Sequence, residues 1–559
     1  MRHFLRLVLL LLVVMPSAYA QLTPPAWGPA YALTSADNLG LVGQQVDAQG
    51  NTYVAGVFQN SVTLAAGTVL TSRGSTDGFV AKYSAVGTLV WAIQAGGPGY
   101  DRPAGLALDA AGTLHLVGNF AGSVQVGPLS VSFTSTAPHF YLATITSQGV
   151  VSTLRQDGQP TVPTSTGTDG SASGIAVDAA GNVYVVGYFS GGPVSFGGTN
   201  LSASAAGARM EYFVAKYGAG TATAQWVRQG GRVPQVAGQV FYTPTLLVSP
   251  VGEAYLVGTF AAGTGAFGAL PLPAELGGFD LGVVKYSPQG TEQWARRSGG
   301  AGLDQARYAA LDDNGHLAVA GAFGGAARFG GQTLLGSGAS SGGLFLYDAF
   351  TGTEQWARVL TGGATALYAD VATDAAGNFY AVGAFDGTGA AGGPALLSAG
   401  GTDAVVVSYS PQGAFRWQQQ SGSAANETAF SVRLDQGQRL HVAGTFVGTA
   451  QLGPMVLTGQ SNVNASVLLA QLAALPLAVR SPLAAQRLSL YPNPAQGAVA
   501  LPTLPTGTLL TLTDACGRTV YCNAPATPVL SLTGLVPGLY HVRATAPGGQ
   551  QWTGQLQAE

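Results

Sequence analysis

Apolar and polar positions along this chain follow one phrase that occurs seven times. The phrase is clearest at residues 177–189, where a short apolar run, an Asp-x-x-Gly turn and a second apolar run ending at Gly-x-Phe indicate a β-hairpin. Seven near-equal copies, 61 to 71 residues apart, predict a repeat architecture. One glycine anchors each copy: Gly56, Gly118, Gly187, Gly258, Gly321, Gly383 and Gly444.

The second apolar run of each copy is predicted to be a strand that is apolar on both faces. Side chains alternate across a strand, so each position can be assigned to a face. The residue two after the anchor glycine is Phe in every copy, and the residues before it are apolar, as at Val185 and Val186. This pattern is typical of a strand between two sheets, and we expect the glycine to make room for a neighbouring sheet.

The turn before this strand begins with Asp in six copies and with Ser249 in the fourth. Asp at the first and Gly at the fourth position suit a type I turn. The string Asp-x-x-Gly-Asn also suggests a calcium loop. However, calcium takes six to eight oxygen ligands, and each turn supplies one carboxylate. The structural interpretation is therefore favoured, and no metal site is expected.

Two further strands complete most copies, as at residues 213–217 and around Trp226. Four strands per copy match a blade of a β-propeller, and a solenoid is the alternative. The seventh copy lacks its tryptophan strand, whereas Trp27 precedes the first anchor glycine at the right spacing. An open stack gains nothing from this permutation, but a ring gains closure. We therefore predict an all-β chain with a seven-bladed propeller of four-stranded blades, closed by the N-terminal strand.

From Trp27 to Leu472 the copies resemble the β-propeller repeats of secreted bacterial proteins. The shared pattern is Asp-x-x-Gly-Asn-x-Tyr-Val-x-Gly-x-Phe, followed by Phe-Val-Ala-Lys-Tyr and then Trp. This resemblance implies the fold and is almost silent on function.

A different module follows a Pro-containing linker at residues 475–487. Its short alternating strands over residues 488–559 predict a small β-sandwich. The module resembles the C-terminal sorting domain of the type IX secretion system, which implies the secretion machinery as a partner and a released or surface-attached product. An ordinary binding sandwich is the alternative. The motif residues are Tyr491, Pro492, Asn493, Pro494, Asp514, Gly517, Arg518, Gly538, Leu539 and Tyr540.

Residues 1–20 have the pattern of a signal peptide. Arg2 and Arg6 precede an apolar stretch at residues 7–14, and Ala18-Tyr19-Ala20 is a cleavage site. An uncleaved anchor is the alternative, but the apolar stretch is well short of the ~20 residues that span a bilayer. We expect a mature protein without a transmembrane segment, secreted or held on the outer membrane, whose propeller occupies residues 21–474. Cys516 and Cys522 could form one disulfide, which the sequence does not decide.

Charge narrows the classes of partner. Charged residues make up 9% of the chain and the net charge is -3, so there is no basic footprint for nucleic acid. A monomer with a glycan or protein ligand is expected.

Catalytic motifs are missing from the sequence. It has no H-E-x-x-H or G-x-S-x-G motif, and the repeats have no cysteine, so no catalytic residue or cofactor is assigned. His115 and His441 occupy a position that is Tyr in other copies, which favours packing over metal binding. Acids before the first strand are the candidate ligand residues, and solvated turn residues are the alternative: Asp37, Asp101, Asp169, Asp304 and Glu427.

Two classes of function remain open. A binding or adhesion module is favoured over an exported propeller enzyme acting on polysaccharide as a lyase or hydrolase. The reason is that the copies are alike, and the longer loops carry few charges.

Overall fold

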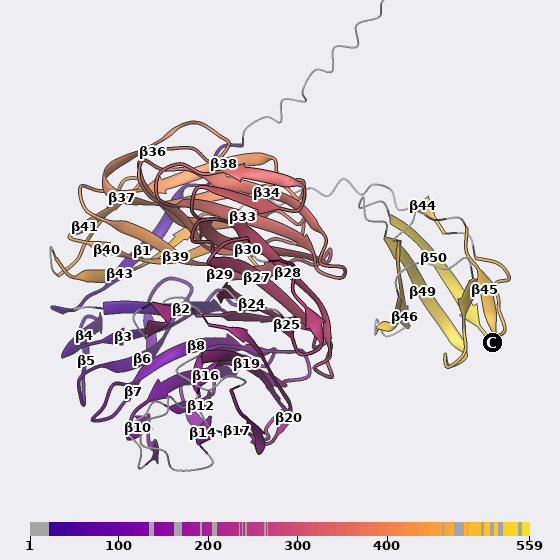
Figure 1. Ribbon diagram of the computed structural model, residues 1–559, viewed down its shortest axis with the longest axis horizontal. Helices are drawn as coiled ribbons and strands as arrows, with labels where there is room; N and C mark the ends of the chain where they lie inside the picture. Colours follow the sequence, from indigo (N-terminus) through magenta and orange to yellow (C-terminus); the bar gives the residue numbers. More distant parts are fainter. Residues whose placement is uncertain are drawn as a thin grey trace, which may run out of the picture. The chain divides into compact units, whose positions relative to one another are not determined.

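The computed structural model describes residues 22–559 except for 38, 134–138, 161–169, 191–192, 204–209, 234, 237–238, 241–242, 262–263, 265, 275, 461–462, 475–485, 489, 503, 505–507, 515–518, 524–528 and 546–550. The regular elements of this part are all β-strands (Figure 1), which confirms the all-β prediction. The chain divides into two compact units, Met1–Pro476 and Leu477–Glu559. Among the described residues, no helix is long and apolar enough to cross a membrane. The predicted signal peptide and most of the predicted linker lie outside the described residues.

The first unit is built from antiparallel sheets with a common four-stranded core, which is consistent with a propeller. Strands follow one another in sequence order within each core. Short turns join the first strand to the second and the third to the fourth, and in most cores a longer segment joins the second to the third. The cores are β2 (Leu39–Val46), β3 (Thr52–Phe58), β6 (Asp77–Tyr83), β7 (Leu89–Gly96); β8 (Arg102–Leu108), β9 (Leu114–Phe120), β12 (His139–Ile145), β13 (Val151–Asp157); β15 (Ser171–Val177), β16 (Val183–Ser190), β19 (Met210–Tyr217), β20 (Ala224–Arg232); β23 (Thr245–Val248), β24 (Ala254–Ala261), β27 (Phe279–Tyr286), β28 (Glu292–Gly300); β29 (Gln305–Leu311), β30 (His316–Phe323), β33 (Ser341–Asp348), β34 (Glu354–Leu360); and β35 (Ala366–Thr373), β36 (Phe379–Gly389), β37 (Leu396–Tyr409), β38 (Phe415–Ser421).

The last repeat shares its sheet with the N-terminal strand. Its order is β1 (Trp27–Leu33), β43 (Ala465–Leu472), β40 (Leu440–Val447) and β39 (Glu427–Leu434). Trp27 therefore lies in the sheet that contains Phe446, in the fourth-strand place, but its register is shifted by one. Trp27 pairs with Leu472, whereas Trp226 pairs with Lys216, the counterpart of Gln471.

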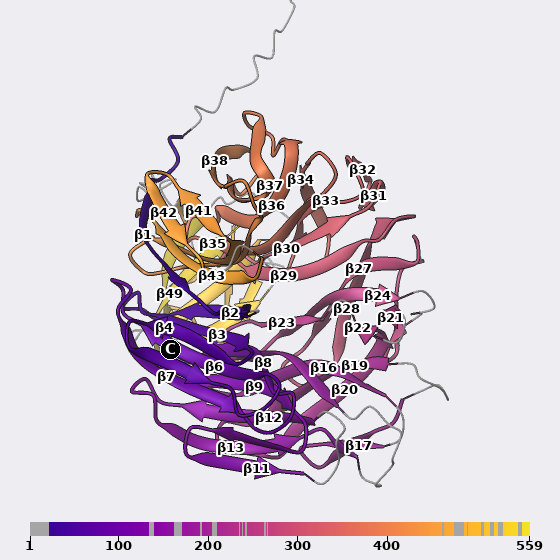
Figure 2. The ribbon, with the colours of Figure 1, turned by 90° about the vertical axis from the view of Figure 1, so that its left-hand side faces the viewer.

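Consecutive sheets share apolar cores, and the first and last sheets share one too. Val54 and Phe58 of β3 pack in one cluster with Ala443, Val467 and Leu469 of the last sheet. The side-chain Nε2 of Gln44 on β2 donates to the carbonyl oxygen of His441 at 2.8 Å. Figure 2 shows these sheets arranged around a common centre, with β2 and β29 close to it.

The anchor glycines make room for a strand of their own sheet, and not for a neighbouring sheet as expected. A β-bulge in the first strand brings its backbone close to the glycine. A Cβ on Gly383 would lie 1.9 Å from the carbonyl oxygen of Leu367 on β35. Pairing of β35 with β36 shifts between Tyr368 and Asp370, beside this contact. Two copies differ: a Cβ on Gly118 would be nearest to the side chain of Tyr141, on β12 of the same sheet, and a Cβ on Gly258 would be nearest to Pro244 Cβ, at 3.4 Å.

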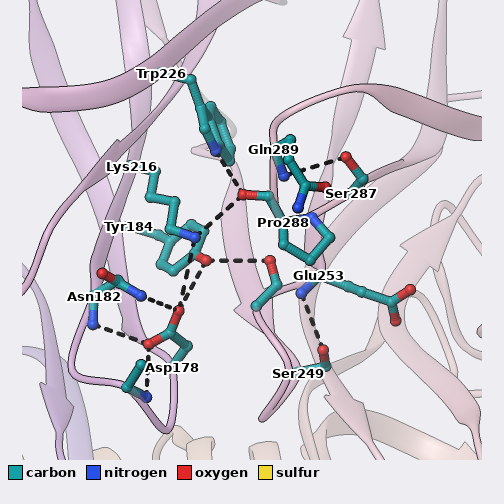
Figure 3. Close-up of polar contacts among 12 residues, drawn as sticks. Asp178, Asn182, Tyr184, Lys216, Trp226, Ser249, Glu253, Ser287, Pro288 and Gln289 are labelled. Carbon is teal, nitrogen blue, oxygen red and sulfur yellow. Dashed lines mark hydrogen bonds and ion pairs between the residues drawn. The ribbon is translucent and has the colours of Figure 1, made fainter. Parts of the chain in front are cut away.

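The Asp-x-x-Gly turns are tied to the next repeat by a polar network (Figure 3). The Asp178 carboxylate accepts hydrogen bonds from both nitrogens of Asn182, at 2.9 and 2.8 Å, and from the Tyr184 hydroxyl at 3.0 Å. The Tyr184 hydroxyl also lies 3.1 Å from the carbonyl oxygen of Gly252 in the following repeat. Side-chain and backbone donors thus saturate the carboxylate, which supports the structural interpretation of the turn over the calcium loop.

Tryptophans of the fourth strands bond to the following repeat in the same way. Trp226 Nε1 donates to the carbonyl oxygen of Pro288 at 3.0 Å, and Lys216 Nζ donates to the same oxygen at 3.2 Å (Figure 3). Trp294 Nε1 makes the equivalent bond to Phe350 at 2.9 Å. The repeated tryptophan is therefore a connection between sheets.

Three of the hairpins between second and third strands enlarge a sheet beyond the four strands predicted, whereas β4–β5 and β41–β42 form two-stranded sheets of their own. The hairpin of β10 and β11 adds to β7, the outer strand of the preceding sheet. The hairpins and further short strands of this unit are β4 (Ser61–Ala65), β5 (Thr68–Thr71), β10 (Ser123–Val126), β11 (Leu129–Ser132), β14 (Gln159–Pro160), β17 (Val194–Phe196), β18 (Thr199–Leu201), β21 (Gln235–Val236), β22 (Gln239–Val240), β25 (Ala266–Phe267), β26 (Leu270–Pro271), β31 (Ala326–Phe329), β32 (Gln332–Leu335), β41 (Thr449–Leu452) and β42 (Met455–Thr458).

The second unit has two sheets around its own apolar core, which includes Leu512, Tyr540 and Leu556. A five-stranded sheet has the order β44-β50-β49-β46-β47, and β45 pairs with β48. The strands are β44 (Gln486–Arg487), β45 (Ala498–Ala500), β46 (Leu509–Asp514), β47 (Thr519–Asn523), β48 (Val529–Ser531), β49 (Gly538–Thr545) and β50 (Gln551–Ala558).

Candidate functional site

Three of the five candidate acids occupy one equivalent, buried position. Asp101, Asp304 and Glu427 each lie 17 residues before their anchor glycine, at the end of the loop that enters a new repeat. Each carboxylate accepts a hydrogen bond from a backbone N–H four residues earlier, so it closes that loop. The donors are Gly97 N at 2.7 Å, Gly300 N at 2.6 Å and Ser423 N at 2.9 Å, respectively.

Burial changes the protonation of these acids. Loss of solvent raises the pKa of Asp101 to about 6 and that of Asp304 to about 6. A second acid, Asp77 or Asp280 respectively, adds a smaller upward contribution to the pKa by charge repulsion. The pKa of Glu427 is also raised, mainly by burial. These carboxyls therefore close their loops by hydrogen bonding, and they ionise at a higher pH than exposed carboxyls do.

The remaining two candidate acids differ from this set. Asp37 is half-buried, and its Oδ2 accepts a hydrogen bond from Asn60 Nδ2 at 2.8 Å. Asp169 lies outside the described residues. The carboxylates of Asp101, Asp304 and Glu427 are bonded within their own loops, whereas that of Asp37 is bonded to Asn60, between β3 and β4. Among the described residues, no three His, Cys, Asp or Glu side chains are grouped to hold a metal ion.

The histidines that replace tyrosine contact the turn carboxylate of their own repeat, as the tyrosine does. His441 Nε2 lies 3.1 Å from the turn carboxylate of Asp435, and His441 Nδ1 lies 3.1 Å from Thr52 Oγ1. His115 Nε2 lies 3.2 Å from Asp109. Both rings bond to the turn of their own repeat, which supports packing over metal binding.

A cavity of about 400 Å³ lies where the first strands of the repeats converge. Figure 2 shows β2, β8, β23 and β29 around this centre. Bulged residues of six first strands line the cavity: Val42, Ala104, Ser173, Arg307, Ala369 and Phe430. Five of these six are small or apolar, and Arg307 is the exception.

Residues that occur in a single copy gather around this cavity. Tyr308 stands where three other first strands have Gly43, Gly105 and Gly174. Arg433, further along β39, also lines the cavity. Sequence reasoning missed these residues, although comparing the first strands position by position would have revealed them.

Two of these positions are fixed by charge and hydrogen bonding. Arg433 Nη1 lies 2.6 Å from Asp370 Oδ2, and this oxygen also accepts a hydrogen bond from Val432 N at 3.0 Å. The Tyr308 hydroxyl reaches across to β2, where it lies 3.5 Å from the carbonyl oxygen of Val42. Tyr308 is nevertheless 36% exposed.

The motif residues of the second unit have separate roles. Tyr491 is 80% exposed, whereas Tyr540 is buried and its hydroxyl donates to the carbonyl oxygen of Val536 at 2.5 Å. Asn493 bonds through both side-chain atoms to the backbone of β50, at Gln555 and Gln557. Gly538 and Leu539 begin β49, and Asp514 ends β46. Cys516, Gly517 and Arg518 lie outside the described residues, as does the side chain of Cys522.

Comparisons with known proteins leave the family open. No protein-family model and no curated protein matches the chain. Solved structures that resemble it include PorZ, a surface component of the type IX secretion system of Porphyromonas gingivalis (12% identity, 93% of this chain and 75% of that chain, TM-score 0.29). A gluconolactonase of Xanthomonas campestris (13%, 81% and 99%, TM-score 0.28) and a quinohemoprotein alcohol dehydrogenase of Comamonas testosteroni (11%, 83% and 78%, TM-score 0.35) are also similar. Similarities at this level assign no function to the chain.

Proposed function

We propose that this protein is an exported binding module, secreted or held on the cell surface, in which a closed seven-bladed propeller spans residues 21–474. Three observations support the closed ring. The strand β1 completes the sheet of the last repeat, the first and last sheets share an apolar core, and first strands from all seven repeats line one cavity. A ring of this kind has no open sheet end.

The proposal of binding is supported by a difference between polar residues that recur among the repeats and polar residues that occur once. Polar residues that recur among the repeats, such as Asp178, Tyr184 and Trp226, connect one sheet to the next. Polar residues that occur once, such as Arg307 and Tyr308, face the cavity. A chain that repeats its structural contacts and carries unrepeated polar residues at its centre is suited to holding one ligand there.

The candidate acids do not favour an enzyme that uses them as acid and base on polysaccharide. Asp101, Asp304 and Glu427 are almost completely buried, and each caps a loop. A general acid or base must lie within hydrogen-bonding distance of its substrate. Arrays of glycans and peptides, probed with the purified mature chain while product release is monitored, test this point. Turnover of a polysaccharide would contradict a binding-only role.

We further propose that residues 1–20 are a signal peptide and that residues 488–559 direct type IX secretion, after a linker at 475–487. The motif from Tyr491 to Pro494, the turn at Asp514 and the strand from Gly538 support this assignment. In a bacterium with this secretion system, the full chain should reach the surface or the medium. A chain ending at residue 476 should stay in the periplasm, and a full chain with the exposed Tyr100 changed to Phe serves as the control. Equal surface delivery without the second unit would overturn the assignment.

A further inference from the structure

We infer that the central cavity binds a neutral ligand rich in hydroxyl groups, such as a sugar of one or two rings, with the aromatic ring of Tyr308 packed against it. This inference rests on the proposed role as a binding module and adds the chemical class of the ligand. Two features of the cavity wall carry it: the backbone edges of the sheets, and aromatic rings that occur in single copies.

Much of the cavity wall is backbone from the edges of sheets. Each of the seven first strands stands at one end of its sheet, as β2 and β15 do. Runs of consecutive residues line the cavity, for example 41–45 and 173–177. Because neighbouring side chains of a strand point to opposite faces, a consecutive run lines one cavity through its backbone. The wall therefore presents N–H and C=O groups of several strand edges.

These uncharged groups suit hydroxyls on a ligand. A hydroxyl both donates and accepts, so it bonds equally to a backbone N–H and to a backbone C=O. Neutral side chains already make such bonds at the wall, where Gln45 Nε2 donates to the carbonyl oxygen of Leu106 at 3.1 Å. An extended peptide fits less well, because it pairs along one continuous edge and the lining is divided among the first strands of seven repeats.

Tyr308 adds an aromatic surface inside the cavity. It is 36% exposed, yet desolvation raises the pKa of its hydroxyl above the ordinary value. A residue that is both accessible and desolvated faces an enclosed space. The apolar C–H face of a sugar packs on such a ring, which leaves the sugar hydroxyls directed at the wall. The Tyr308 hydroxyl has a long contact of 3.5 Å to Val42, so a sugar oxygen offers a better acceptor.

The fold does not require aromatic rings at this wall. Phe430 occupies the bulged position of its first strand, where other strands form the same bulge with Ala104 and Ala369. Tyr308 stands at the next position, where β2, β8 and β15 have glycine. Phe430 is half-buried and Tyr308 is exposed. Both rings are therefore additions to the common repeat at the place where a ligand would lie.

The charge and size of the cavity agree with this class of ligand. Arg433 lines the cavity, and its Nη1 lies 2.6 Å from Asp370 Oδ2. Asp370 compensates the charge of Arg433, so this pair adds hydrogen-bonding groups to the wall without adding net charge. The volume of about 400 Å³ is near the lower end of the range of small-molecule pockets, which suits one or two sugar rings.

Titration calorimetry of the purified mature chain with glucose, N-acetylglucosamine and cellobiose tests the inference. Cyclohexanol, a ring with one hydroxyl, measures apolar packing alone, and sodium glucuronate measures any preference for a carboxylate through Arg307. Tyr308→Ala removes the ring, whereas Tyr308→Phe removes only the hydroxyl. Tyr100→Ala is the matched control, because Tyr100 is 53% exposed and lies outside the cavity lining. Circular dichroism and thermal midpoints establish that each variant is folded.

At least one of the three neutral sugars should bind, with an affinity that stays within about 2-fold as salt is raised, because no charge on the ligand is recognised. We expect Tyr308→Ala to weaken binding by about 10-fold, Tyr308→Phe by about 2-fold to 5-fold, and Tyr100→Ala not at all. Cyclohexanol should bind at least about 10-fold more weakly than that sugar, because it lacks most of the hydroxyls.

Four outcomes would overturn the inference. They are a folded wild-type chain that binds no neutral sugar at tens of millimolar, glucuronate binding about 10-fold tighter than glucose, cyclohexanol binding as tightly as the sugars, and sugar binding that Tyr308→Ala leaves intact. None of them contradicts the proposed function, because a chain that reaches the surface and binds an acidic glycan or a peptide would still be a binding module. Failure of surface delivery, by contrast, would leave the sugar site standing.

Discussion

Replacing one anchor glycine by alanine should destabilise the first unit, whereas the same change at another copy should not. The three atoms nearest to a Cβ at Gly383 would all be backbone atoms: the carbonyl oxygen of Leu367 at 1.9 Å, its carbonyl carbon at 2.9 Å and Tyr368 Cα at 3.0 Å. Backbone atoms within a bonded sheet cannot rotate away as a flexible side chain does. Gly258 provides the matched control, because its Cβ would meet nothing closer than 3.4 Å.

The expected magnitude follows from this crowding. Overfilling a packed site costs about 1–3 kcal/mol, and a carbonyl at this distance places Gly383→Ala at the upper end, about 3 kcal/mol. Gly258→Ala should be neutral or stabilising by up to about 1 kcal/mol, because alanine restricts the unfolded chain. At about 2.1 cal/mol/K of unfolding entropy per residue, a unit of this length loses about 1 °C per kcal/mol.

Differential scanning calorimetry of the two variants and the parent chain measures the effect. The midpoint of the first unit should fall by about 3 °C for Gly383→Ala and stay within about 1 °C for Gly258→Ala. Equal shifts for the two variants would refute the reasoning, because they would show that the bulge in β35 does not crowd the anchor glycine.

Three further predictions address the contacts between sheets, the loop caps and the shared sheet. Tyr184→Phe removes a buried hydroxyl that serves Asp178 and Gly252, so it should cost about 1–2 kcal/mol in chemical denaturation, whereas Tyr100→Phe, at an exposed ring, should cost nothing. In the folded chain the pKa of Asp101 and of Asp304 is about 6, above the ordinary value of ~3.9, so ionising these acids opposes folding. Their contribution to the free energy of unfolding should therefore rise as pH falls from about 7 to about 4. The double variant Asp101→Asn with Asp304→Asn should flatten that part of the plot of melting temperature against pH. An unchanged profile would contradict the burial of these two acids. A permuted chain in which residues 22–36 are moved to follow Ala473 through a short turn should fold, because Ala473 N already donates a hydrogen bond to the carbonyl oxygen of Ala26 at 2.9 Å. If this permuted chain showed no thermal transition, that result would argue against β1 as the partner of β43.

Periodicity predicted the strands well because the same physical demand recurs in each copy. The Phe two after each anchor glycine must be buried, and it is buried in the cores between sheets, as at Phe189 and Phe446. The predicted role of the anchor glycine was wrong, because no local sequence pattern reveals a β-bulge in the strand that pairs with the strand of the glycine. The outer hairpins were missed for a similar reason: their strands are only two to five residues long.

The candidate site was harder to predict, because its residues are exceptions to the repeat. Asp101, Asp304 and Glu427 attracted attention as acids in loops, yet their constant distance from the anchor glycine is the mark of a structural residue. Arg307 and Tyr308 lack this mark, because the residues in their places differ from copy to copy: Val42, Ala104, Ser173, Ala369 and Phe430 for Arg307, and Gly43, Gly105, Gly174, Asp370 and Ser431 for Tyr308. In a chain of near-identical repeats, deviation from the common pattern is the better guide to function.

The sheet shared by both ends of the first unit also sets the order in which the chain can fold. Asn464 bonds to the backbone of Ala36, 428 positions earlier, so this contact cannot form until nearly the whole unit has been synthesised. Bringing such distant segments together costs about 5 kcal/mol of loop-closure entropy, and the remaining sheets must form first to reduce it. Until then β43 keeps an open edge. The first unit therefore stays incomplete until its last repeat has been synthesised.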